Sequence, residues 1–178
     1  IFGLGGDRAA PVTAAARPAP AASTDRAEPW PPDSATRVSP RLAYAAAQRV
    51  AFIGIDADSR AMSFDGAAQG GETFVVPLGW TVEVRLRNGD AAPHSARVVA
   101  SRDTIPLTIP GAVFAGAESP NAEAGVGSGR SQVFRFSASR AGSYLIACAV
   151  PGHAAAGMYV RLVVQADAST PSWRGARP

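Results

Sequence analysis

The sequence predicts an all-β fold: a Greek-key β-sandwich or barrel of about eight strands, preceded by a disordered N-terminal extension. Apolar and polar residues alternate with a period of two from residue 49 onward, as in half-buried strands. These runs are short and are separated by Gly, Pro, Asn and Asp, which is typical of all-β domains. The first 39 residues show neither feature.

Residues 1–39 are rich in Pro and Ala and contain six of the fifteen prolines of the chain. Such a composition buries too little apolar surface to offset the entropy of ordering, so we expect a disordered tether. The alternative is that the segment wraps onto the domain through Trp30. The opening letters "IFGLGG" suit the trailing end of an export signal or membrane anchor. We therefore expect an exported protein, periplasmic or on the outer face of the cell membrane.

The domain itself is expected to cover residues 40–167, with a flexible C-terminal tail at 168–178. Its first segment, "PRLAYAAAQR" at residues 40–49, contains the helix-forming residues Ala and Leu, and Pro40 suits a helix start. We expect one or two helical turns there, before the first strand.

The strand prediction is clearest in "WTVEVRLRN", where Trp80, Val82, Val84 and Leu86 share one face. Similar runs occur along the rest of the domain. The eight predicted strands are Arg49–Ile55, Ala61–Phe64, Thr73–Val76, Trp80–Asn88, Ala96–Ala100, Gln132–Phe136, Ser143–Cys148 and Met158–Gln165. The stretch 101–130 is too long and too rich in Gly and Pro for a plain turn, and loops of that length are usually functional or disordered.

Charge and composition exclude several classes of protein. All 17 basic residues are arginine, yet the formal net charge is only +3, and no basic stripe or basic–aromatic platform is visible. We therefore expect no nucleic-acid partner. No apolar run approaches the roughly 20 residues of a membrane-spanning helix. The single cysteine excludes an intrachain disulfide.

That cysteine lies in the stretch "CAVPGHAAAGM", which also holds one of the two histidines and one of the two methionines. Cys148 shares its phase with Ile146, and Met158 with Val160, so both sulfur atoms are expected to point inward. The other histidine, His94 in "DAAPHSARV", opens a separate strand. Each residue alone is more often structural: Met and free Cys are common in cores, and histidine has several routine uses.

Taken together, the four side chains match a known ligand set. Two imidazole nitrogens, one thiolate and a weak thioether are what copper uses in electron-transfer sites. In the spacing C-x₄-H-x₄-M, one loop carries Cys148, His153 and Met158, while His94 comes from a neighbouring strand. The alternative that remains is a metal-free β-sandwich that serves as an interaction domain.

Several segments of the chain resemble the sulfocyanins, a branch of the cupredoxins related to rusticyanin. They are "FVVPLGWTVEVRLRN", "PHSARVV", "SPNAEAGVGSGRSQVFRFSA" and "GSYLIACAVPGHAAAGMYVRLVV". The resemblance spans roughly residues 49–166. It implies a cupredoxin-like Greek-key sandwich with one type 1 (blue) copper, Cu(I)/Cu(II), bound by His94, Cys148, His153 and Met158. Many cupredoxins have Asn after the first ligand histidine, whereas this chain has Ser95, as rusticyanin-like members do.

The same resemblance implies a function. Sulfocyanins carry single electrons in membrane-associated respiratory chains, so we expect a monomeric carrier whose partners are redox proteins such as a cytochrome or a terminal oxidase. A copper-binding module for delivery or storage is the alternative. Copper enzymes are disfavoured, because Ala147 and Ala149 stand where multicopper oxidases have histidines beside the cysteine. No histidine or second cysteine remains for another copper.

Overall fold

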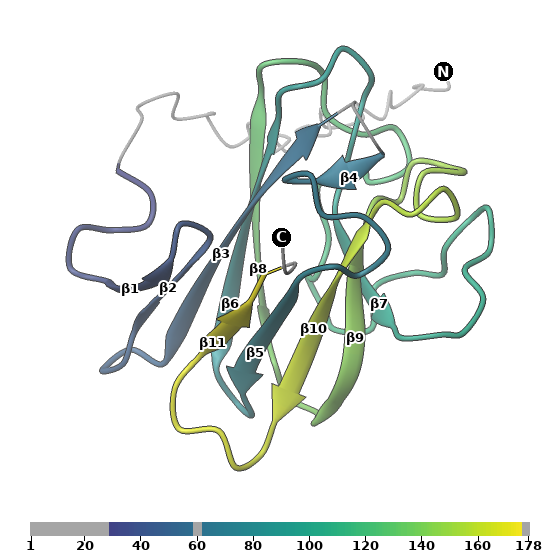
Figure 1. Ribbon diagram of the computed structural model, residues 1–178. Helices are drawn as coiled ribbons and strands as arrows, with labels where there is room; N and C mark the ends of the chain where they lie inside the picture. Colours follow the sequence, from purple (N-terminus) through teal and green to yellow (C-terminus); the bar gives the residue numbers. More distant parts are fainter. Residues whose placement is uncertain (1–28, 59–61, 176–178) are drawn as a thin grey trace, which may run out of the picture.

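Two β-sheets packed face to face make up the computed structural model, which describes residues 29–58 and 62–175 (Figure 1). The predicted all-β sandwich is thus confirmed, and the described residues contain no helix. Within them, therefore, no helix has the length and apolar character needed to cross a membrane.

The described residues form eleven strands. They are β1 (Thr36–Ser39), β2 (Leu42–Ala45), β3 (Val50–Asp58), β4 (Ser63–Phe64), β5 (Thr73–Pro77), β6 (Thr81–Asn88), β7 (Arg97–Ala100), β8 (Ser131–Ser137), β9 (Gly142–Ala147), β10 (Tyr159–Gln165) and β11 (Ser172–Arg174). The eight predicted strands correspond to β3 to β10, while β1, β2 and β11 were not predicted.

One sheet has the strand order β1-β2-β3-β6-β8, with β4 paired to β3, and the other has the order β11-β5-β10-β9-β7. The pairs β3–β6 and β5–β10 are parallel, and all other pairs of named strands are antiparallel. Strands β5 and β6 are neighbours in the chain but lie in opposite sheets. The connection from β9 to β10 stays within the second sheet, and this connection carries the candidate ligands.

The core lies between the two sheets, where the alternating strand residues point. Val82, Val84 and Leu86 of β6 are fully buried, as their shared phase predicts. From the facing sheet, Ile146 of β9 and Leu162 of β10 enter the same apolar cluster. This packing fixes the ends of β9 and β10, and with them the loop that joins the two strands.

The helix expected over residues 40–49 is wrong. Leu42–Ala45 forms strand β2, which pairs with β3 so that Leu42 lies opposite Ile53 and is buried. Ser39 Oγ accepts hydrogen bonds from the backbone N–H groups of Arg41 and Leu42, which turns the chain between β1 and β2. Pairing with a distant strand overrides the modest helix preference of Ala and Leu.

Part of the predicted tether is also ordered. Residues 1–28 lie outside the described residues, but Thr36–Ser39 forms β1, and Trp30 packs on the first sheet. The Trp30 indole N–H donates to Glu83 Oε1 at 3.1 Å, and Arg85 lies 5.9 Å from the ring centroid. A Cβ atom at Gly54 would come within 2.5 Å of the Trp30 ring, so this glycine makes room for it. The prediction of a tether reaching to residue 39 is therefore wrong from residue 29 onward.

The C-terminal tail shows a similar difference. Ser172–Arg174 forms β11, which pairs with β5 and places Trp173 opposite Phe74, where it packs on the core. The predicted flexible tail is therefore wrong for these residues, and residues 176–178 lie outside the described part. Trp173 supplies apolar burial, and pairing with the edge of β5 supplies backbone hydrogen bonds. The composition of the tail alone does not suggest either.

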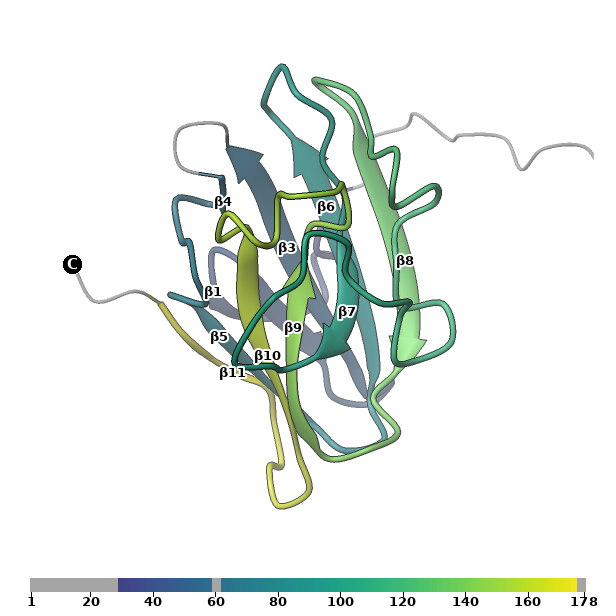
Figure 2. The same cartoon turned by 90° about the vertical axis from the view of Figure 1, so that its right-hand side faces the viewer.

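The long segment 101–130 covers the outer face of the second sheet, where it runs across β7 and β9 (Figure 2). Leu145 and Ala147 alternate with the core residues of β9, so they point outward, yet they are buried. Ile109 and Ala122 of the long segment pack on them, together with Ala154 of the β9–β10 loop. Arg97 of β7 forms ion pairs with Glu118 and Glu123 and so fastens the segment to the sheet.

Candidate metal centre

The β9–β10 loop, residues 148–158, is closed at its base by the backbone. The Cys148 N–H donates to the Met158 carbonyl at 3.0 Å, and the Met158 N–H donates to the His153 carbonyl at 3.0 Å. Within the loop, the His153 N–H donates to the Val150 carbonyl at 3.1 Å. These bonds hold Cys148, His153 and Met158 on one compact turn.

The second ligand segment joins β6 to β7 and carries His94. Its backbone forms a two-way bridge to the long segment: the His94 N–H donates to the Val126 carbonyl at 3.2 Å, and the Val126 N–H donates to the His94 carbonyl at 2.7 Å. Gly125, beside this bridge, has φ +73°, and a Cβ there would come within 3.0 Å of His94 backbone atoms and of Val150. The long segment therefore touches both ligand-bearing segments at one point.

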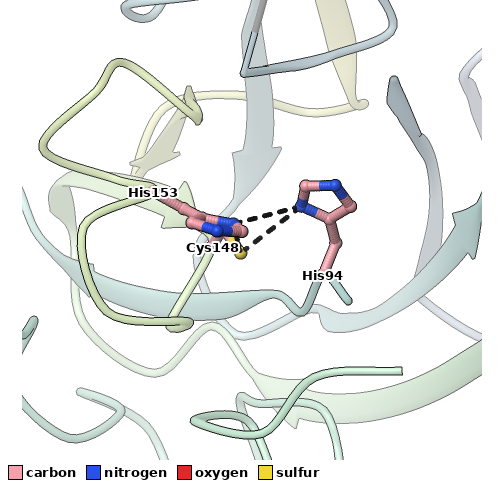
Figure 3. Close-up of side chains that lie close together, drawn as sticks. All are labelled: His94, Cys148 and His153. Atoms are coloured by element: carbon pink, nitrogen blue, oxygen red, sulfur yellow. Dashed lines mark hydrogen bonds between the residues drawn. The ribbon is translucent and has the colours of Figure 1, made fainter. Parts of the chain in front are cut away.

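Three of the four predicted ligands converge (Figure 3). His94 Nδ1 lies 3.2 Å from His153 Nδ1 and 4.0 Å from Cys148 Sγ, and Cys148 Sγ lies 3.5 Å from His153 Nδ1. His94 and Cys148 are 0% exposed, whereas His153 is half-buried. The thiol and the two imidazoles that the sequence singles out therefore lie together in the structure.

The fourth predicted ligand, Met158, lies at the base of the loop next to Cys148, to which its backbone is hydrogen-bonded. Its side chain is 0% exposed and packs in the same core cluster as Cys148. The inward direction that the period-two pattern predicts for both side chains agrees with this burial.

The donor set suits copper. Two imidazole Nδ1 atoms and one thiol sulfur face one another in a buried space. Sulfur and imidazole ligands bind copper well, whereas the harder alkaline-earth ions prefer oxygen ligands. One ion bound between them would satisfy all three donors. The residues present therefore fit a single mononuclear copper.

Ser95 links the two ligand segments. Its hydroxyl oxygen accepts a hydrogen bond from the Ala149 N–H at 2.9 Å, and its own backbone N–H points at Cys148 Sγ at 3.4 Å. Ser95 is fully buried, so these contacts are shielded from water. The serine therefore connects the two ligand-bearing segments.

Two polar residues that sequence reasoning missed lie behind His94. The His94 Nε2–H donates to Asp90 Oδ2 at 2.8 Å, and Asn88 Nδ2 donates to the carbonyls of Ala92 and Val126, each at 2.8 Å. In the sequence both belong to "NGDAAP", which is read as a turn. An acid four residues before a ligand histidine was the available signal.

The surroundings of the histidines shift their pKa values in opposite directions. Burial, together with the neighbouring His94, lowers the pKa of His153 below its ordinary value. Burial also acts to lower the pKa of His94, but hydrogen bonds with Cys148 and Asp90 outweigh it and the net shift is upward. The hydrogen bond from His94 lowers the pKa of Asp90, so its carboxylate remains an acceptor.

Comparison with known proteins identifies the family. The family model described as the sulfocyanin (SoxE) domain matches residues 37–173, which is most of the chain. The chain belongs to the sulfocyanin family. The match also includes β2 and most of β1 and β11, the strands that the sequence pattern did not predict.

One curated relative and two solved structures are similar to this chain. The sulfocyanin of Sulfolobus acidocaldarius is 26% identical over 139 residues, which cover 72% of this chain and 70% of that protein. Reduced rusticyanin has the same fold, with a TM-score of 0.51 and 20% identity over 68% of this chain and 82% of rusticyanin. Auracyanin A, a blue copper protein from Chloroflexus aurantiacus, aligns with a TM-score of 0.49 and 24% identity over 65% of this chain and 99% of auracyanin.

Family and geometry together establish the cofactor. This member of the sulfocyanin family is a blue copper cupredoxin with one type 1 copper, for which His94, Cys148 and His153 supply the clustered donor atoms. Cupredoxins of this kind are electron carriers rather than typical enzymes.

Proposed function

We propose that the protein is a one-electron carrier of a membrane-associated respiratory chain, with its copper held by His94, Cys148, His153 and Met158. The observation that carries the proposal is the cluster of one thiol and two imidazoles, whose ligand atoms lie within 4.8 Å of one another at the end of the sandwich. Bound there, copper supplies a one-electron Cu(I)/Cu(II) couple.

The chain's own part is to keep the donors in place. Cys148 follows β9 directly and Met158 precedes β10. These two strands pair from Tyr159 opposite Ala147 to Val164 opposite Gly142. His94 is held by its backbone bridge to Val126. Donors fixed in this way by the scaffold need to move little when the charge of the site changes, which favours fast electron transfer.

Burial argues against the alternative of copper delivery or storage. Handing a metal ion to another protein requires ligands that an incoming donor can reach, but His94 and Cys148 are 0% exposed. His153 is the half-buried member of the set. An electron can pass through this imidazole, whereas a copper ion buried behind it is not accessible to the ligands of another protein.

The surface around His153 suits brief contacts with a partner. Pro151, Ala155 and Ala156 are exposed and carry no charge. A small apolar rim desolvates easily and binds weakly, as a carrier that must release its partner after each transfer requires.

The proposed partners are redox proteins such as a cytochrome or a terminal oxidase. The proposed location is outside the cytoplasm, periplasmic or on the outer face of the membrane, and the proposed tether includes residues 1–28, which lie outside the described residues.

A matched pair of variants tests whether electrons pass between copper and partner at the surface around His153. Ala155→Glu places a charge in the rim and should slow electron transfer to a cytochrome or oxidase about tenfold, with an unchanged visible spectrum. Ala166→Glu makes the same change at an exposed site beyond the other end of β10 and should leave the rate at the wild-type value at moderate salt. Equal rates in both variants would mean that electrons enter and leave at another part of the surface.

Chelator challenge separates a carrier from a delivery module. The reduced, copper-loaded protein should pass one electron per copper to an oxidant and keep its copper in the presence of a Cu(I) chelator. Transfer of the copper to the chelator as fast as the electron transfer would favour delivery and would overturn the proposal.

A further inference from the structure

The second nitrogen of His94 faces a carboxylate rather than solvent or a backbone carbonyl. His94 Nε2 lies 2.8 Å from Asp90 Oδ2, and the side chain of Asp90 is 9% exposed. Within the described residues, Asp90 forms an ion pair with His94 and with no arginine. The negative charge of Asp90 is therefore directed at the histidine.

The carboxylate has little freedom to turn away. Asp90 Oδ1 accepts a hydrogen bond from the Ala91 N–H, which leaves Oδ2 for His94. The Asp90 N–H donates to Asn88 Oδ1 at 2.9 Å, and the side-chain amide of Asn88 holds the carbonyls of Ala92 and Val126. Because Val126 is bridged to the His94 backbone, Asp90 and His94 are held by one connected network.

A carboxylate can only accept a hydrogen bond, so the proton on the His94 ring belongs on Nε2. The lone pair then lies on Nδ1, the atom that faces Cys148 and His153. An imidazole that donates to a carboxylate is also a stronger donor through its other nitrogen. Asp90 thus acts on the metal centre through His94, without contact with the metal.

We propose that Asp90 is the positioning residue of this centre, fixing His94 with Nδ1 toward the metal and lowering the reduction potential. The inference rests on the proposed function. A negative charge in a buried site stabilises Cu(II) more than Cu(I), since the attraction grows with the charge of the ion.

The first test is the reduction potential of the full chain carrying Asp90→Asn, which keeps the size of the side chain and an acceptor oxygen but removes the charge. The equilibrium with a redox buffer should shift about tenfold toward Cu(I), a rise of ~59 mV for one electron. The control is Asp167→Asn, the same change at an exposed site beyond the far end of β10, which should shift the equilibrium less than twofold. Equal potentials in the two variants would overturn the proposal.

A second measurement uses wild-type protein and does not depend on a variant that folds. In the Cu(I)-loaded chain, the Nε2 proton of His94 should give an NMR resonance shifted far downfield by the carboxylate. A resonance at the position of an ordinary neutral imidazole would contradict the role of Asp90.

Copper affinity adds a third readout. Asp90→Leu removes the acceptor and should weaken Cu(II) binding about tenfold, with a smaller effect on Cu(I). Equal losses for the two oxidation states would mean that Asp90 only supports the fold. Uptake of copper by the wild-type chain without a blue band would instead overturn the proposed function, so the two failures are distinguishable.

Discussion

The two segments that close the copper end, residues 148–158 and residues 101–130, differ in what they contribute. The short loop carries Cys148, His153 and Met158 within eleven residues. The long segment carries no histidine or cysteine, yet it covers the outer face of β7 and β9 and touches both ligand-bearing segments. The ligands therefore come from the short loop and from His94, and the long segment fixes where they meet.

The largest expected effect concerns the short loop. Cys148→Ser removes the one thiol of the chain, and with it the donor that a type 1 copper requires, so the blue colour should be lost completely. The measurement is the visible spectrum after Cu(II) is added. A persisting blue band would show that the colour does not come from this loop.

The corresponding change in the long segment should affect stability instead. Ile109→Ala deletes a buried side chain of the cluster with Leu145 and should lower the free energy of unfolding by about 2 kcal/mol, with the blue band retained. Denaturant titration measures the loss. Leu107→Ala, two residues away at a side chain that is 72% exposed, is the control and should cost less than about 0.5 kcal/mol. Equal losses would mean that the long segment is not packed on the sheet.

The point where the long segment meets the ligand segments offers a sharper test. Gly125→Ala adds a Cβ within 3.0 Å of the His94 backbone and of Val150, and should destabilise the protein by about 1–2 kcal/mol and shift the visible spectrum. Gly129→Ala has nearly the same positive φ but no atom within 4 Å of the new Cβ, so it should show backbone strain without a spectral change. Identical spectra in the two variants would remove the link between the long segment and the site.

The smallest expected effect belongs to Met158. Met158→Leu should keep the copper and raise the reduction potential by ~59 mV or more, because a weak thioether donor is lost, whereas Met158→Gln should lower it. Potentiometry of the three proteins gives the order. Equal potentials would mean that Met158 only fills the core.

The same contrast between segments explains what could be predicted from the sequence. Strands such as β8 and β10 show a period of two because they bury one face and expose the other, and the ligands stand out because Cys and His are so scarce in this chain. Both signals are local, so they could be read directly.

The remaining features depend on partners far away in the chain. The local sequence around Leu42 predicts a helix, but in the structure Leu42 pairs with Ile53 in a sheet. The sequence around Trp30 predicts a linker, but its side chain contacts Gly54 and Glu83. A contact made by the folded chain decides both cases, and no local pattern records either contact. Asp90 is different, because its partner His94 lies only four residues away and this spacing was a local signal.

Titration of the full chain with Cu(II), followed by absorption and EPR, tests the central claim most directly. With His94, Cys148 and His153 around one ion, and Met158 as the proposed fourth ligand, the blue thiolate-to-copper band should grow until one equivalent is bound and then stop. The EPR spectrum should show narrow copper hyperfine splitting. A titration that ends without the blue band, or copper that gives the wide splitting of ordinary nitrogen and oxygen sites, would contradict the account.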